Sequence, residues 1–249
     1  MALQIRDQGA TSIFILNRPD KLNALSLELR KELLNSLRKF NSDPSKRVAV
    51  ITGEGKAFSV GADLGSVSSD LTDDLRSSFY PILREIRFSP KIYISAINGV
   101  VAGAGISLAL ACDLRVASRG ARFVTAFHNI GLAPDTGLTL ILTRLTGARF
   151  LDLLLIGGEM SAQELEREGV VRLSDDPLTE ALKLAEQISA GAYRSYVASK
   201  KLINRALFHD LDEYLEYESA MQGYLGSTQD FKEGIKAFLE KRKPEFRGE

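Results

Sequence analysis

Short apolar runs predict a series of strands along the first two thirds of the chain. Residues 3–6 and 13–17 are expected to pair as a hairpin around a glycine turn. The runs at 47–52 and 92–97 are almost wholly apolar, as in strands that are buried inside an α/β layer. Further short strands are expected at 114–117, 123–127 and 170–173.

Apolar residues at helical spacing separate these strands. Ser26 is expected to cap a helix whose buried face carries Leu29, Leu33, Leu37 and Phe40. A second amphipathic helix is expected over 72–88, ended by Pro90, and a third over 104–111. Residues 177–242 predict three or four more helices, with an apolar stripe formed by Tyr214, Tyr217, Met221 and Tyr224. The alternation predicts an α/β fold.

Charge and cysteine content exclude several classes of protein. The 249 residues include 32 Lys and Arg against 32 Asp and Glu, which gives no electrostatic reason to expect nucleic acid or an anionic membrane as a partner. One cysteine, Cys112, excludes an internal disulfide framework and points to a reducing compartment. There is no signal-peptide pattern and no apolar run long enough to span a bilayer. We therefore expect a soluble cytoplasmic protein.

Two glycine-rich turns follow predicted strands. One lies in I-N-G-V-V-A-G-A-G-I-S-L-A-L-A-C-D at 97–113, and the other in K-A-F-S-V-G-A-D-L-G at 56–65. Glycine allows a ligand to approach the backbone, and the free N–H groups at a helix start suit an oxygen that develops negative charge. Two such turns that converge would form an oxyanion hole. The alternative is that these glycines serve only tight packing.

Other site chemistries are disfavoured. Leu108 occupies the third glycine position that a dinucleotide-binding turn would need, and His128 and His209 lack metal-ligand spacing. A triad of Ser107, His128 and Asp135 lacks the G-x-S-x-G turn, and the Ser107 hydroxyl is expected to bond a carbonyl of its own helix.

The two turns, in this order and spacing, resemble those of the crotonase (enoyl-CoA hydratase/isomerase) superfamily. The resemblance extends through N-R-P-D-K-L-N-A-L at 17–25, G-L-A-P-D-T-G at 131–137, S-A-Q-E-L-E-R-E-G-V-V at 161–171 and F-L-E-K-R-K-P-E-F at 238–246. It implies a spiral core of repeated ββα units over 1–190. It also implies a helical region over 191–249 that builds trimers, often paired into hexamers. The implied substrate is an acyl-CoA thioester, with no further cofactor.

Particular residues inherit expected roles from this resemblance. The two oxyanion-hole amides fall on Ala62 and Ala104. Substrate-binding positions fall on Leu22, Asn23 and Ala24 in the adenine-side loop, and on Gly61, Asp63, Leu64, Gly65, Gly103 and Gly105 in the two turns. The segment 65–80 is expected to contribute to the pocket.

The departures from the family pattern bear on the reaction. The two glutamates of enoyl-CoA hydratases are replaced by Ser107 and Phe127, which cannot activate a water molecule as a carboxylate pair does. Asp135, in P-D-T-G, resembles the acid/base of the subgroup that isomerises ring-epoxyacyl-CoA and shifts enoyl double bonds. A Phe127 wall would raise its pKa. Leu138 departs from that subgroup, which usually has a second glycine.

Alternatives remain for both the residue and the protein. Asp135 precedes a predicted helix, so it is also a candidate N-cap. The favoured activity is an acyl-CoA isomerase with Asp135 as the proton carrier. The other readings are an enoyl-CoA hydratase and a catalytically silent CoA-binding subunit.

Overall fold

The computed structural model describes residues 1–66, 68 and 70–249, and its largest element is a six-stranded sheet. The strands lie in the order β1 (Leu3–Gln8), β2 (Thr11–Leu16), β3 (Val48–Gly53), β5 (Ile92–Ile97), β7 (Leu114–Ser118) and β10 (Arg172–Ser174). Only the β1–β2 hairpin is antiparallel; the other neighbours pair in parallel. The predicted strands are confirmed, with β10 beginning two residues after the expected 170.

A second sheet has four strands, and three of them each come directly after a strand of the first sheet in the sequence. It contains β4 (Ala57–Ser59), β6 (Val100–Ala102), β8 (Arg122–Thr125) and β9 (Gly158–Ser161). The chain passes from β3 to β4, from β5 to β6 and from β7 to β8, with helices between these pairs, so each step repeats a strand–strand–helix unit. This arrangement confirms the predicted spiral of ββα units, and it leaves the ends of β4 and β6 side by side.

Helix α1 (Leu27–Ser42) forms as the sequence predicts. The Ser26 hydroxyl accepts a hydrogen bond from the Leu29 amide, and the four expected apolar side chains are buried. They pack with the inner face of the sheet and with α3 (Tyr80–Arg87), α4 (Ala104–Ala111) and α5 (Leu138–Thr146), which together enclose the main core. Shorter helices α6 (Leu151–Ile156) and α7 (Ala162–Arg167) flank β9.

The helix expected over 72–88 is interrupted, which corrects the prediction. It consists of α2 (Leu71–Asp74), a π-helical turn over Leu75–Phe79 and then α3. Pro81 has no N–H, and its ring clashes with the carbonyl four residues earlier, so the preceding turn widens. Residues 67 and 69 of the expected pocket segment lie outside the described residues.

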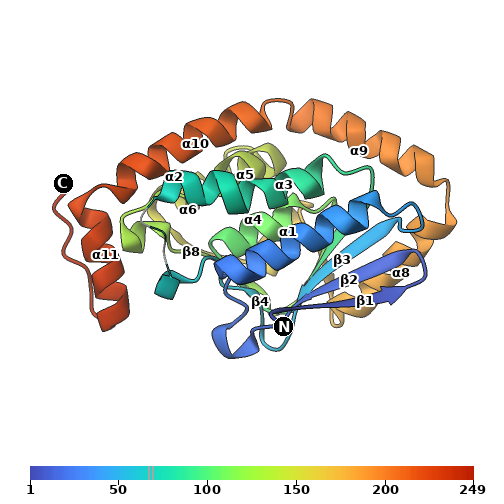
Figure 1. Cartoon of the computed structure of the whole chain (residues 1–249), viewed down its shortest axis with the longest axis horizontal. Helices are drawn as coiled ribbons and strands as arrows, with labels where there is room; N and C mark the ends of the chain where they lie inside the picture. Colours follow the sequence, from blue (N-terminus) through green and yellow to red (C-terminus); the bar gives the residue numbers. More distant parts are fainter. Residues whose placement is uncertain (67, 69) are drawn as a thin grey trace.

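Four helices complete the chain: α8 (Pro177–Ala190), α9 (Tyr193–Leu207), α10 (Leu211–Gly226) and α11 (Gln229–Glu240). Helix α8 covers the outer face of the sheet, where it buries apolar side chains from β2, β3 and β5. The other three arch across the opposite side of the molecule (Figure 1), and α11 packs against the turn at residues 127–131 that follows β8. None of the helices among the described residues is long and apolar enough to cross a membrane.

Candidate active site

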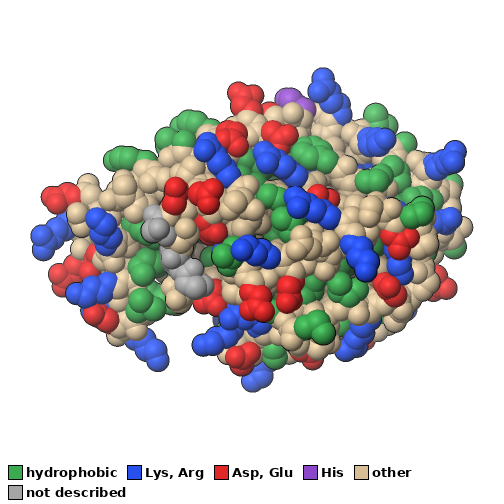
Figure 2. Space-filling view, viewed as in Figure 1, with side chains coloured by type: hydrophobic (Ala, Val, Ile, Leu, Met, Phe, Trp, Pro, Cys, Tyr) green, Lys and Arg blue, Asp and Glu red, His purple; other side chains and the backbone are tan. Residues whose placement is uncertain are grey.

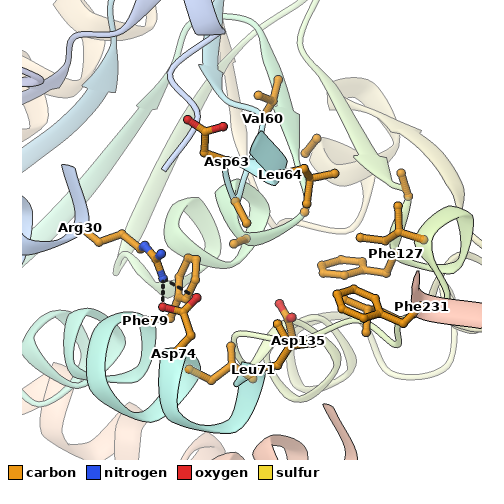
Figure 3. Close-up of a pocket in the computed structure, with 18 residues that line it drawn as sticks. Arg30, Val60, Asp63, Leu64, Leu71, Asp74, Phe79, Phe127, Asp135 and Phe231 are labelled. Atoms are coloured by element: carbon orange, nitrogen blue, oxygen red, sulfur yellow. Dashed lines mark hydrogen bonds and ion pairs between the residues drawn. The ribbon is translucent and has the colours of Figure 1, made fainter. Parts of the chain in front are cut away.

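The two glycine turns border one cavity of about 140 Å³. Apolar side chains form most of its wall, together with the backbone of both turns. Phe127, from the 3-10 turn Phe127–Ile130, and Phe231, from α11, lie together on one side of it (Figure 3). Figure 2 shows the molecular surface hollowed beside α11. The predicted site residues that line the cavity are Ala62, Asp63, Leu64, Gly103, Ala104, Phe127 and Asp135.

Glycine allows the two turns to touch. A Cβ atom on Gly61 would lie 2.7 Å from the Ala102 carbonyl oxygen and 2.9 Å from the Ala104 nitrogen. A Cβ on Gly105 would lie 2.4 Å from the carbonyl oxygen of Ser59. Tight packing, which was the alternative interpretation of these glycines, is therefore real. It also brings the two turns to the same cavity.

Two backbone amides at the cavity have no acceptor among the described residues. Ala104 is the first residue of α4, so its N–H has no carbonyl partner inside the helix. Neither the Ala104 amide nor the Ala62 amide donates a hydrogen bond to another of the described residues. Both residues line the cavity, where these donors are available to an oxygen atom of a ligand.

The Asp135 carboxyl group also borders the cavity, and it does not cap a helix. Thr136 and Gly137 both have positive φ angles, +53° and +75°, so the chain turns twice before α5 begins. Gly137 is the N-cap of α5, which has no side-chain cap. The N-cap interpretation of Asp135 is therefore wrong. Its carboxylate Oδ2 accepts a hydrogen bond of 2.7 Å from Gln222 Nε2 instead.

The surroundings of Asp135 make it a usable proton acceptor near neutral pH. Burial is the main cause that raises its pKa, to about 6. The hydrogen bond from Gln222 and a hydrogen bond with Thr136 act in the opposite direction because they stabilise the charged form. The negative charge of Asp74 adds to the increase in the pKa, and the positive charge of Arg30 offsets part of it.

A second carboxyl group, Glu218, lies behind this turn and was not predicted. Its side chain is 5% exposed and accepts hydrogen bonds from the Gly137 amide, at 3.0 and 3.1 Å, and from the Tyr80 hydroxyl, at 3.0 Å. Burial, followed by the charge of Asp135, raises the pKa of Glu218 to about 8. Glu218 therefore fixes the turn that carries Asp135.

Both unpredicted partners come from α10, where the apolar stripe was misassigned. The buried face of this helix carries Leu211, Leu215, Glu218, Ser219 and Gln222, at helical spacing. Tyr217 and Tyr224, which the predicted stripe included, are 66% and 67% exposed. Two polar side chains on a buried helical face are the sequence signal that would have identified these residues.

Ser107 supports the turn and is not a nucleophile. Its hydroxyl lies 3.3 Å from the Asp135 carbonyl oxygen and 2.6 Å from the Thr136 hydroxyl, so the expected bond within its own helix is wrong. His128 makes no hydrogen bond with it, and the His128 Nδ1 atom has no partner among the described residues. Within the described part of the chain, no group of three or more His, Cys, Asp or Glu side chains is placed to hold a metal ion.

Six of the predicted substrate-binding residues do not line this cavity. Asn23 is fully buried, and its amide nitrogen donates to the carbonyl oxygens of Ala57, at 2.8 Å, and Glu54, at 2.9 Å. Its side chain therefore holds the loop together and cannot contact a ligand. The other five are Leu22, which is 43% exposed, and Ala24, Gly61, Gly65 and Gly105.

Comparisons with known proteins find relatives that match almost the whole chain. The family model described as enoyl-CoA hydratase/isomerase matches residues 7–249. A 1,2-epoxyphenylacetyl-CoA isomerase from Escherichia coli is 38% identical over 94% of this chain and 93% of the relative. A probable enoyl-CoA hydratase from Rhodobacter capsulatus is 36% identical over 95% and 94%. A solved enoyl-CoA hydratase from Mycobacterium avium subsp. paratuberculosis superposes with a TM-score of 0.91, at 29% identity, over 99% of both chains.

Proposed function

The chain belongs to the enoyl-CoA hydratase/isomerase family, and from that premise we propose that it is an acyl-CoA isomerase. The proposed reaction converts a 3-enoyl-CoA to a 2-enoyl-CoA, or isomerises a ring-epoxyacyl-CoA. The observation that carries the proposal is the carboxylate arrangement around the cavity. Among the described residues, three carboxylates border it, and two of them are ion-paired: Asp63 with Arg18 and Asp74 with Arg30. Asp135 is the remaining one.

The double-bond shift needs one group that takes a proton and returns it. Asp135 removes a proton from C2, and the electron pair left behind delocalises into the thioester carbonyl to give a dienolate. The protonated Asp135 then delivers the proton to C4, which places the double bond between C2 and C3. A pKa of about 6 suits both steps, because neither the acid nor the base form is strongly favoured near neutral pH.

The two free amides supply the stabilisation that the dienolate requires. The N–H groups of Ala62 and Ala104 bind the thioester oxygen more strongly as it gains charge, so they lower the barrier to proton removal. Phe127 and Phe231 exclude water from the same cavity. Hydration lacks support from this cavity, since Ser107 is buried and holds the Asp135 turn.

The test compares isomerisation of a 3-enoyl-CoA with hydration of a 2-enoyl-CoA by the wild type and by Asp135→Asn. We expect wild-type isomerisation to exceed hydration, and kcat for isomerisation to fall at least about a hundredfold in the variant. Asp175→Asn, at an exposed site, is the control with full activity. Unchanged isomerisation in Asp135→Asn would refute the mechanism.

Two other results would identify the alternatives. Fast hydration of 2-enoyl-CoA by the wild type would show an enoyl-CoA hydratase, the name that relatives such as the Rhodobacter capsulatus protein carry. CoA-thioester binding with no turnover of any enoyl substrate would show a silent CoA-binding subunit.

A further inference from the structure

Arg30 is a buried cation at the edge of the cavity. It extends from α1 and is 5% exposed. Its hydrogen bonds to the described residues all leave from one nitrogen, Nη1, which donates to Asp74 Oδ1 at 2.8 Å, to Asp74 Oδ2 at 2.9 Å and to the Ser78 hydroxyl. The Arg30 Cζ atom lies 4.1 Å from the centre of the Phe79 ring. Figure 3 places this pair on the side of the cavity opposite Phe127 and Phe231.

The other two nitrogens of the Arg30 guanidinium group donate no hydrogen bond to the described residues. Arg30 Nε is buried without a hydrogen-bond partner, and Nη2 has none among the described residues. A buried donor that belongs to a cation costs free energy when it is left unpaired, so each such group needs a physical reason. Pairing with Asp74 is not a sufficient reason, because a lysine nitrogen could make the same contact. The Nη2 donors suit a ligand atom in the cavity, whereas the Nε atom is buried out of reach of a ligand.

The charges around the cavity limit the chemistry of that atom. Asp74 already neutralises Arg30, and Asp135 lies in the same cavity. A carboxylate would gain one hydrogen bond but would meet two like charges. A neutral acceptor, such as a hydroxyl, ketone, ether or epoxide oxygen, gains a charge-assisted hydrogen bond without that repulsion.

We infer that Arg30 binds a neutral oxygen atom on the acyl group, so that this site takes oxygenated acyl thioesters in preference to plain hydrocarbon ones. The inference rests on the proposed function in one respect, namely that the acyl group occupies this cavity. It goes further by assigning the substrate class and the residue that selects it.

The test measures the binding of saturated CoA thioesters, which cannot be isomerised. Each ligand pair differs by one ether oxygen in place of a methylene, and the oxygen is moved stepwise along the chain. A hydrogen bond to a charged group contributes roughly 1.5–3 kcal/mol, which is about tenfold or more in Kd. We therefore expect at least one ether position to bind about tenfold more tightly than its hydrocarbon match. In Arg30→Lys, which keeps a cation beside Asp74 but loses the Nη2 donors, this preference is expected to disappear.

Arg38→Lys is the matched control, because Arg38 lies on the same helix, is exposed and does not line the cavity. Equal binding of every matched pair by the wild type would overturn the inference, whatever the variant does. A preference that persists in Arg30→Lys would assign it to another residue. Tighter binding of a carboxylate-ended thioester than of the best ether would overturn the neutral class. Failure of all thioesters to bind would instead refute the acyl-CoA site itself.

Discussion

Burial and hydrogen bonding act in opposite directions on the carboxyl group of Asp135. Burial disfavours its charged form, whereas the amide of Gln222 donates to it at 2.7 Å and favours that form. The resulting pKa of about 6 therefore depends on both effects, and a substitution that weakens either one is expected to shift it. Asp135 accepts a proton only when it is ionised, so the proposed activity rises with pH through this value.

Replacement of Gln222 tests this balance. Gln222→Leu removes the donor, so we expect the pKa of Asp135 to rise above about 6 and the acidic limb of kcat/KM to move to higher pH. A shift of about one pH unit corresponds to about 1.4 kcal/mol, which is in the range for a hydrogen bond to a charged group. The measurement is the pH profile of isomerisation, with the exposed Gln187→Leu as the control. An unshifted limb would show that Gln222 does not act on Asp135.

At the scale of elements, the site depends on how α10 packs against the turn before α5. Glu218 accepts hydrogen bonds from the Gly137 amide and from Tyr80 on α3, so three elements meet at one carboxyl group. The interrupted helix before α3 also contributes, because its short first part carries Asp74 to Arg30. The reactive turn is thereby held by elements distant in sequence.

The raised pKa of Glu218 makes stability depend on pH in a stated direction. Its pKa is about 8 in the folded protein against an ordinary value of 4.5, so its contribution to stability is fully present below pH 4.5 and is lost as pH rises through 8. We expect Glu218→Gln to lack this loss and to be more stable than the wild type at pH 9, by about 1–3 kcal/mol.

Urea unfolding at pH 5 and pH 9 measures this difference. Glu216→Gln is the control, because Glu216 lies on the same helix and is half exposed. Parallel stability curves for the wild type and Glu218→Gln would contradict the assignment.

At the scale of the whole molecule, the three C-terminal helices present apolar side chains to solvent. Tyr217 and Tyr224 are exposed on α10, and Leu202, Phe238 and Leu239 are exposed on the neighbouring helices. Figure 2 shows hydrophobic side chains along the edge of the molecule that α10 forms. Exposed apolar surface of this kind is typical of an interface between proteins. The homotrimer, or dimer of trimers, stays a prediction.

Mass measurement in solution tests this prediction. We expect sedimentation equilibrium to give three or six times the chain mass, and the double substitution Tyr217→Glu with Tyr224→Glu to lower it, because charges are costly in a buried interface. Lys183→Glu, on the exposed side of α8, is the control. A monomeric wild type would refute the assembly.

The sequence allowed prediction of features that depend on local order. The buried runs of β3 and β5, the Ser26 cap and the glycine turns all follow from neighbouring residues. Arg30, Glu218 and Gln222 could not be found in this way, because their partners lie 44 to 138 residues away. Asp135 was identified through motif resemblance, whereas its pKa and its orientation depend on α10, which only the folded structure brings to it.

The order of the elements along the chain has a consequence for biosynthesis, because Gln222 and Glu218 lie on a helix that is made after both glycine turns. A ribosome that has released residues 1–190 has already made both glycine turns, but not the helix that supplies the partners of Asp135 and Gly137. Chains fold from the N-terminus during translation. The nascent spiral therefore acquires its two amide donors and Asp135 before the α10 side chains that hold this turn in place. A chain that stops before α10 would therefore keep both glycine turns but lack the hydrogen bonds to Asp135 and Gly137.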